Sequence, residues 1–466
     1  MLYGNGVSKS IDWEILASSM HHEDVNFKPP TRSNVIGADI DFDNNAGVVF
    51  FKHIFPSVEG HAKIIDKYLS NPAAEYYSLV WSHKIQFFDV DDKDPDWKVK
   101  QCYLILIAAA TETENGDENL WMKGMHLWHP YPDFRCCMSQ NEMKAFCSAA
   151  PFCWTDDRYW YAPDRDTPWE VFLPCIYQFN DRCQKLIWTS LLLLDESMSG
   201  WQPKISKLGG LPNYMFEPRK PVPLWTMFWN GVECMSNVLV FQDVVQLHEV
   251  QSPKKYFGEE SHLPNKANIR SHAAEDLHQV EGAKVKPGGW VGGDSWFGSV
   301  LSAVEMKWWF DVHSTWVIKQ NTDFFPMKVM HSVLHAWHGE GPAGHWVVFC
   351  VTIGEVALIA IAYAWSQSSI SYFVSTCGST RPATESNETH FEDEFGLICS
   401  HKVNWPELLP WVYDYSPLVN EHNKQWQSLL HLEKKWPMKN CWFHLLTMLV
   451  GISVVDMDQV YLPELW

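Results

Sequence analysis

An apolar run from Leu186 to Leu194, broken by one polar pair, ends at Asp195-Glu-Ser-Met198. Its length and aliphatic content predict a buried β-strand. A buried strand that ends on an acidic residue can hold a carboxylate rigidly at a sheet edge, where a metal ion or substrate can reach it. Asp195 is therefore a candidate site residue, and capping of the following turn is its alternative role.

The apolar and polar positions after Asp195 predict further strands and helices. Two strands are expected to form a hairpin with its turn at Asn230-Gly231, since Asn-Gly suits a type I′ turn. The elements expected from the pattern are strands at 224–229, 238–245 and 315–318, and helices at 300–308, 418–435 and 442–455. The Ser/Thr/Glu-rich stretch 378–393 is expected to be a loop.

The mostly apolar stretch from Trp346 to Trp365 is long enough to span a bilayer. Glu355 stands at its centre, however, where a charged side chain would be costly in a membrane, and its content of β-branched residues is high. We therefore predict two strands joined by a turn at Thr352-Ile-Gly-Glu-Val356, and no membrane association.

The first part of the chain has weaker patterns. Residues 1–85 lack sustained periodicity and are expected to be a poorly structured lead-in. Residues 86–185 are expected to form a helical domain, which begins with a helical pattern from Trp97 to Ala110.

Composition narrows the class of protein. The 466 residues are 46% apolar, which predicts a globular protein of two or three domains. The formal net charge of −20 lowers the expected strength of non-specific DNA binding, because phosphate contacts need a basic face. The 12 cysteines contain no CxxC pair, which argues against a zinc ribbon. The N-terminal residues do not resemble a signal peptide, so we expect an intracellular protein with free thiols.

Two local patterns imitate known sites without completing them. The glycine-rich stretch 288–299 lacks the Gly-Lys-Ser/Thr ending of a phosphate-binding P-loop. His331, His335 and His338 share one face of a predicted helix, but Ser332 stands where a zinc protease needs Glu. We favour ordinary histidines over a metal site there.

Four blocks in a fixed order resemble the piggyBac transposase family. The helix around Phe179-Asn-Asp-Arg182 precedes the strand that ends in Asp195-Glu-Ser-Met198, which the Tyr-Met, Lys-Pro and Trp positions at 214–225 follow. Asp294-Ser-Trp-Phe-Gly-Ser299 is similar to the family's Asp-Asn-Phe-Phe-Thr-Ser motif. Val419-Asn-Glu-His-Asn-Lys424 is similar to its Val-Asp-x-x-Asp-Gln motif. The resemblance runs from Trp97 to Tyr461.

The resemblance implies an α/β fold. It has an RNase H-like catalytic core, interrupted by a β-rich insertion and preceded by a helical N-terminal domain. On this reading, residues 186–330 form the first part of the core, 331–403 the insertion, and 404–466 the last helices of the core.

The resemblance also implies a catalytic site in which three carboxylates bind two Mg²⁺ or Mn²⁺ ions. Asp195 and Asp294 match the first two positions and are the expected metal ligands. One register places Asn420 at the third position and another places Asn423 there, and both residues are neutral. The candidate catalytic residues are therefore Asp195, Asp294 and Asn420.

The expected function follows from this incomplete set. The chain resembles a transposase-derived protein whose ancestral chemistry is metal-dependent DNA strand cleavage and transfer, and the loss of the third carboxylate is expected to impair it. The alternatives are an active transposase that uses Glu421 or Asp414, or a domesticated, non-enzymatic DNA- or protein-binding module. The resemblance implies DNA at transposon ends as partner, residence in the nucleus, and is compatible with a homodimer.

Overall fold

The computed structural model describes most of the chain from position 190 onward and a few residues before it. The described residues are 11–15, 190–200, 224–245, 287–319, 322–338, 344–366, 368–384, 387–392, 396–435 and 441–461, with scattered residues at 138–144, 169–183 and 215–218. The predicted helix at 97–110 and most of the first two predicted domains lie outside these residues. The boundaries of the five domains stay predictions.

The apolar run before Asp195 forms the central strand of the molecule, β2 (Leu191–Gly200). Its backbone pairs antiparallel with β4 (Leu224–Glu233) on one side and parallel with β6 (Trp290–Gly293) on the other. Leu191 to Leu194 are all buried, so both faces of the sheet are covered at this point. The predicted strand is confirmed, but it continues through Asp195 to Gly200 instead of ending there. Asp195 therefore lies within a strand and does not cap a turn.

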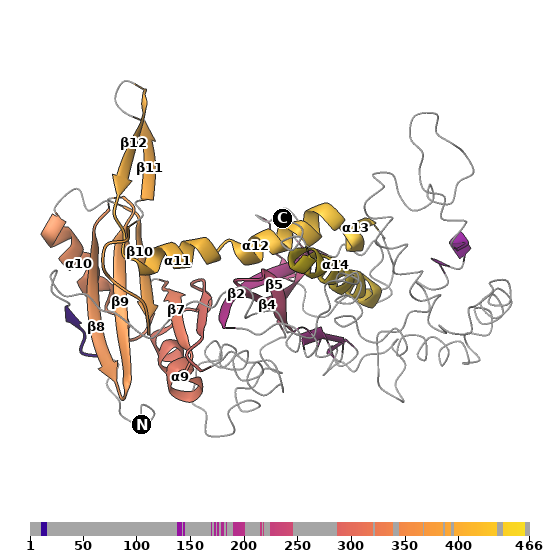
Figure 1. Cartoon of the computed structure of the whole chain (residues 1–466), viewed down its shortest axis with the longest axis horizontal. Coiled ribbons are helices and arrows are strands. Elements are labelled where there is room, and N and C mark those ends of the chain that lie inside the picture. Colours follow the sequence, from indigo (N-terminus) through magenta and orange to yellow (C-terminus); the bar gives the residue numbers. More distant parts are fainter. Residues whose placement is uncertain are drawn as a thin grey trace.

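Around β2 the sheet grows to ten strands of mixed direction. Its order is β1-β8-β9-β10-β7-β6-β2-β4-β3, and β5 also pairs with β4. The strands not yet given are β1 (Glu14–Ile15), β3 (Met215–Phe216), β5 (Val238–Val244), β7 (His313–Val317), β8 (Trp346–Ile353), β9 (Val356–Ala364) and β10 (Ile370–Ser375). β2, β6 and β7 run parallel, whereas all other neighbouring pairs are antiparallel. The strands of the predicted insertion thus extend the same sheet beyond β7 (Figure 1).

The apolar stretch around Glu355 is a β-hairpin, as predicted. β8 and β9 pair from Trp346–Tyr363 to Ile353–Val356, and the chain turns at Gly354 with a φ of 63°. Glycine adopts this left-handed conformation without steric cost. Among the described helices, none is both long enough and apolar enough to cross a membrane.

The prediction of a turn at Asn230-Gly231 is wrong. β4 runs through both residues, and the chain turns at 234–237, where Asn237 takes the positive φ of 57°. Gly231 instead sits opposite Leu194 next to a β-bulge. A Cβ there would lie 3.0 Å from the Leu192 side chain and 3.2 Å from Phe241. Close packing between strands, and not turn geometry, explains this glycine.

The prediction of a loop at 378–393 is also wrong in part. β11 (Asn387–Glu392) pairs antiparallel with β12 (Ile398–Val403) as a separate two-stranded sheet. This hairpin projects from the end of the large sheet (Figure 1).

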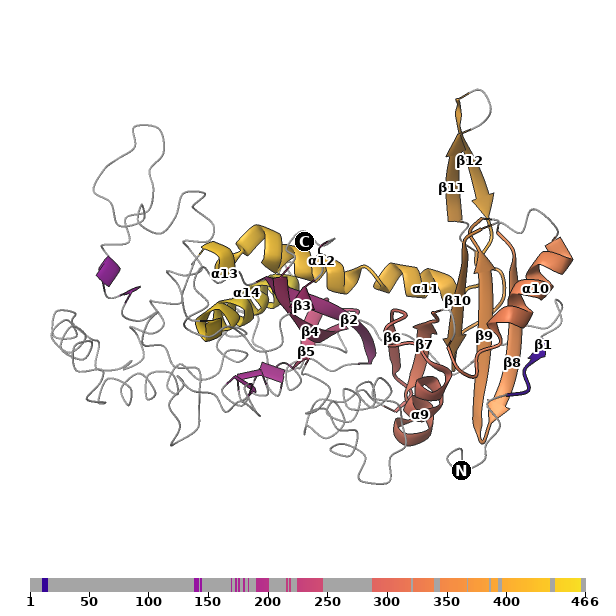
Figure 2. The same ribbon diagram turned by 180° about the vertical axis from the view of Figure 1, so that it is seen from behind.

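Helices cover the sheet. α9 (Val300–Phe310) connects β6 to β7 as predicted, and Ser299 caps it by accepting the N–H of Ser302 at 3.1 Å. α10 (Met327–His338) packs on β8 and β9. α11 (Leu408–Tyr415) leads into the C-terminal helices, which run along the β2–β4–β5 part of the sheet (Figure 2).

The C-terminal helices differ in one respect from the prediction. The expected helix at 418–435 is divided into α12 (Leu418–Lys424), a π-helix η7 (Gln425–Leu430) and α13 (Leu432–Lys435). His431 interrupts it with a φ of 49°. The predicted last helix is present as α14 (Cys441–Tyr461), and it packs against β5 and η7.

Candidate active site

Asp195 and Asp294 occupy neighbouring backbone positions, although they are distant in the sequence. β2 and β6 are parallel neighbours, and their last paired residues are Leu194 and Gly293. Asp195 is the next residue of β2, and Asp294 is the first residue after β6. Because parallel strands in register bring equivalent positions side by side, the backbones of the two candidate residues lie next to each other.

Backbone groups hold both carboxylates. The N–H of Glu196 donates to Asp195 Oδ1 at 2.7 Å, and the N–H of Trp296 donates to Asp294 Oδ1 at 2.7 Å. Asp195 is half-buried, whereas Asp294 is exposed. A hydrogen bond from the local backbone orients each carboxylate and leaves its second oxygen for another partner.

The loop after Asp294 is shaped by close backbone contacts. The N–H groups of Phe297 and Gly298 donate to the Asp294 carbonyl at 3.2 and 3.1 Å. A Cβ on Gly298 would lie 1.9 Å from the carbonyl oxygen of Val317, so only glycine fits. This tight turn allows α9 to begin at once and keeps Asp294 at the end of β6, level with Asp195 in the middle of β2.

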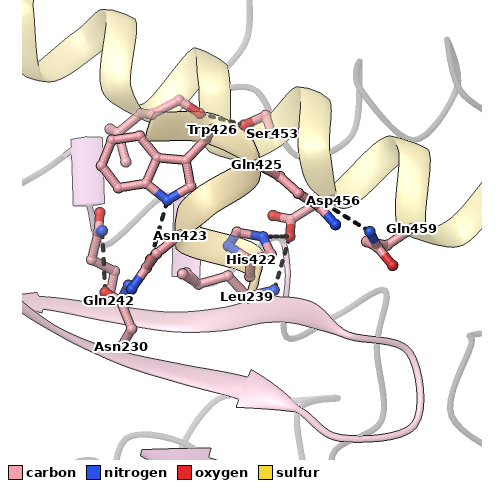
Figure 3. A network of polar contacts seen from close by, with 11 residues as sticks. Asn230, Leu239, Gln242, His422, Asn423, Gln425, Trp426, Ser453, Asp456 and Gln459 are labelled. Atoms are coloured by element: carbon pink, nitrogen blue, oxygen red, sulfur yellow. Dashed lines mark hydrogen bonds and ion pairs between the residues drawn. The ribbon is translucent and has the colours of Figure 1, made fainter. Parts of the chain in front are cut away.

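Asn420 provides the third side chain of the site. It lies on α12, and its Nδ2 donates to Asp195 Oδ2 at 3.3 Å. Asn423, the other candidate for the third position, lies one turn further along and is buried. Its Nδ2 donates to the carbonyl of Glu196 at 3.2 Å, and its Oδ1 accepts from Trp426 Nε1 at 3.2 Å (Figure 3). The geometry thus favours Asn420 as the residue that faces Asp195.

The acidic alternatives do not reach this corner. Glu421 and Asp414 are exposed. Glu421 follows Asn420 on α12 and therefore points about 100° away around the helix.

A row of polar side chains continues from Asp195 across the sheet, and sequence reasoning missed it. Asn230 of β4 is opposite Asp195, and Gln242 of β5 is opposite Asn230. Both are fully buried, and Gln242 Nε2 donates to Asn230 Oδ1 at 3.3 Å (Figure 3). The available signal was an amide inside each of two mostly apolar strands. The assignment of Asn230 to a turn concealed it.

A buried hydrogen bond between His422 and Asp456 holds α12 against α14 next to the site. His422 Nε2 and Asp456 Oδ1 are 2.8 Å apart, and both side chains are fully buried. Asp456 Oδ1 also accepts the backbone N–H of Leu239 at 2.9 Å (Figure 3). Burial raises the pKa of Asp456, and the contact with His422 opposes that rise. These contacts connect α12, α14 and β5.

Asn180 holds the outer edge of the same sheet. Its Oδ1 accepts the N–H of Gln242 at 2.9 Å, and its Nδ2 donates to the Gln242 carbonyl at 2.8 Å. The side chain therefore replaces a neighbouring strand at this point of β5. Asn180 belongs to the block that resembles the family's helix before the first catalytic strand.

The residues of the site do not fit a pair of divalent cations. Mg²⁺ and Mn²⁺ prefer carboxylate oxygens, and two ions need several of them. The donors here are two carboxylates and an amide that turns its N–H toward Asp195. In the described part of the chain, no three His, Cys, Asp or Glu side chains cluster closely enough to hold a metal ion. This also applies to His331 and His335, whose rings lie with centroids 4.4 Å apart and are tilted by 41°.

Comparison with known proteins gives a match in structure only. No family model matches the sequence, and no curated protein matches it. A cryo-electron microscopy structure of a piggyBac transposase synaptic complex with hairpin DNA superposes with a TM-score of 0.61 at 13% sequence identity. The match covers 90% of this chain and 75% of that chain. The chain therefore has a mixed α/β fold that resembles the fold of a piggyBac transposase.

Proposed function

We propose that this chain is a DDE/D-type protein derived from a piggyBac transposase, with a catalytically impaired site. Its ancestral chemistry is metal-dependent cleavage and transfer of DNA strands. One observation carries the proposal: the Asn420 amide donates to Asp195 at the corner where that chemistry requires a third carboxylate. An amide offers one neutral oxygen, and its N–H group occupies the oxygen that a cation would need.

The strand order supports an RNase H-like core. β2, β4 and β5 form consecutive antiparallel pairs, and β6 and β7 then add in parallel on the other side of β2, with α9 between them. Asp195 lies on the first of these strands, and Asp294 directly follows the fourth. The added strands β8 to β12 support the proposal of a β-rich insertion before the last helices.

The proposal assigns DNA as the partner and the nucleus as the place of action. Asp195 and Asp294 would keep their ancestral positions beside the scissile phosphate. With Asn420 at the third corner, the chain would bind DNA without cutting it. The net charge of −20 implies that binding depends on a local basic surface and weakens with salt.

A hairpin-ended DNA duplex tests this proposal. The full chain is incubated with the duplex and Mn²⁺ at low salt, then analysed by mobility shift and on a denaturing gel. We expect a salt-sensitive complex and intact strands. Asn420→Asp is expected to produce nicks, whereas Asn420→Asp combined with Asp195→Asn is not. Mn²⁺-dependent nicking by the unchanged chain would contradict the impaired site, and absence of a complex would contradict DNA as the partner.

The same hydrogen bond favours a second candidate, a domesticated module that uses the fold only for binding. Because the Asn420 amide satisfies Asp195, the site is stable without cations. Selective, salt-dependent binding of one DNA end over random duplex would distinguish such a module from a decayed copy.

A further inference from the structure

Three side-chain amides on one helical stretch contact β2, one after another along the strand. Asn420 and Asn423 lie on α12, and Gln427 lies on η7. Their contacts advance along both elements together: Asn420 Nδ2 donates to Asp195 Oδ2 at 3.3 Å, Asn423 Nδ2 to Glu196 O at 3.2 Å, and Gln427 Nε2 to Met198 O at 2.9 Å. We call these three residues the amide ladder.

The two carbonyls reached by the ladder face the side of β2 where β6 ends. Successive carbonyls of a strand point to alternate sides. The Ser190 carbonyl accepts from Trp290 N of β6, whereas the Leu191 carbonyl accepts from Cys234 N on the β4 side. The even-numbered carbonyls therefore face β6, which stops opposite Leu194. Asn423 and Gln427 bond the next two carbonyls on that side.

The local helix geometry selects which amides face β2. The spacing from 420 to 423 and from 423 to 427 keeps the three side chains on one face of the helix. Gln425 is on the same π-helix and is also half-buried, but its Oε1 accepts from Gln459 Nε2 of α14 at 2.9 Å. Two similar amides two residues apart thus bond different elements, and only Gln427 bonds β2.

We propose that Asn423 and Gln427 are positioning residues that set how closely position 420 approaches Asp195. They continue the hydrogen bonding of β2 beyond β6 and so fix the depth of α12 at the site. Trp426 stabilises this arrangement, because its indole N–H holds the Asn423 oxygen. The inference rests on the proposed function, which gives position 420 its role as the third corner.

The test uses the full chain carrying Asn420→Asp, with Mn²⁺ affinity measured by calorimetry well below the unfolding temperature. Gln427→Met keeps the side-chain volume and removes the donor, and Gln425→Met is the matched control. We expect Gln427→Met to weaken Mn²⁺ binding about tenfold, as the loss of an outer-shell partner does. Gln425→Met is expected to leave the affinity unchanged, although both variants lose one amide.

A second measurement needs no metal. Urea midpoints are compared for Asn420→Ala, Gln427→Met and the double variant in the unchanged background. The ladder predicts that the two midpoint shifts do not add, whereas those of Asn420→Ala and Gln425→Met do. If Asn420→Asp binds no Mn²⁺, the proposed function is contradicted, and the urea measurement alone tests the positioning role of the amide ladder. Additive midpoint shifts would overturn the inference. If Asn420→Asp binds Mn²⁺, equal affinity in the two glutamine variants would also overturn it.

Discussion

Asp456 is a carboxylate that folding removes completely from water. A buried charge is stabilised only where it is paired and hydrogen-bonded, and Asp456 has His422 and the N–H of Leu239 as partners. Neither partner is close in sequence, which is why the sequence alone assigned no role to Asp456, a residue just beyond the predicted helix 442–455. The contact between His422 and Asp456 holds α12 in place, and therefore also Asn420.

We predict that Asp456→Ala lowers the free energy of unfolding by about 3 kcal/mol, because it leaves His422 and a strand N–H unpaired in the core. Asp458→Ala, two residues along on the exposed side of α14, is the control and is expected to change it by less than about 0.5 kcal/mol. Urea unfolding measures both. Equal effects would contradict the structural role of the pair.

Glu433 and His444 are a second buried pair of titratable groups. Burial raises the pKa of Glu433 to about 8 and lowers the pKa of His444 to about 4. His444 Nδ1 contacts the Glu433 carbonyl at 3.2 Å, and its Nε2 contacts Ser199 Oγ on β2 at 3.0 Å. Both side chains are therefore uncharged in the folded protein near pH 6.

The two shifts give stability a predicted pH dependence. Glu433 binds its proton more tightly in the folded than in the unfolded protein, so its contribution to the free energy of unfolding is lost as pH rises toward 8. His444 acts in the opposite sense, and its contribution to the free energy of unfolding is lost as pH falls from 6.5 toward 4. Of these two groups, only Glu433 changes the free energy of unfolding between pH 6.5 and 8, by at most about 2 kcal/mol.

We predict that the unfolding free energy falls between pH 6.5 and 8 and that Glu433→Gln removes most of this fall. Urea unfolding at several pH values gives the two slopes. Parallel slopes for both proteins would show that Glu433 does not titrate in this range.

At the scale of elements, hydrophobic periodicity predicted the strands and helices that local sequence determines. It identified β2, the β8–β9 hairpin, α9 and α14. It failed where tertiary contacts decide, as at Asn230-Gly231, whose turn propensity is overridden by packing against Leu192 and Phe241. It also missed the π-helix, since apolar spacing does not distinguish a π-turn from an α-turn.

Two glycines test the packing of individual elements. Gly298→Ala is expected to destabilise the protein by about 1–3 kcal/mol, because its Cβ meets the fixed carbonyl of Val317. Gly451→Ala, inside α14, has its nearest neighbour at 3.7 Å and is expected to stabilise by about 0.5–1 kcal/mol. Thermal unfolding shows whether each variant is more or less stable than the unchanged chain. Destabilisation by Gly451→Ala would contradict the packing of α14.

At the scale of the whole molecule, the decisive fact is the parallel pairing of β2 with β6. Local patterns do not determine which strands pair, so the strand pattern suggested Asp195 alone, and Asp294 was added only through a resemblance. The register of the third position also stayed open between Asn420 and Asn423, because both occur in the same motif. The fold separates them, since α12 turns Asn420 toward Asp195 and buries Asn423 against β2.

The most direct test of the central claim is calorimetric titration of Mn²⁺ into the unchanged chain and into Asn420→Asp. If the site kept its two aspartates and lost the third carboxylate, the unchanged chain gives no saturable binding. Asn420→Asp then binds Mn²⁺, and adding Asp294→Asn abolishes that binding. Saturable binding by the unchanged chain, or identical titrations of the unchanged chain and Asn420→Asp, would contradict the account.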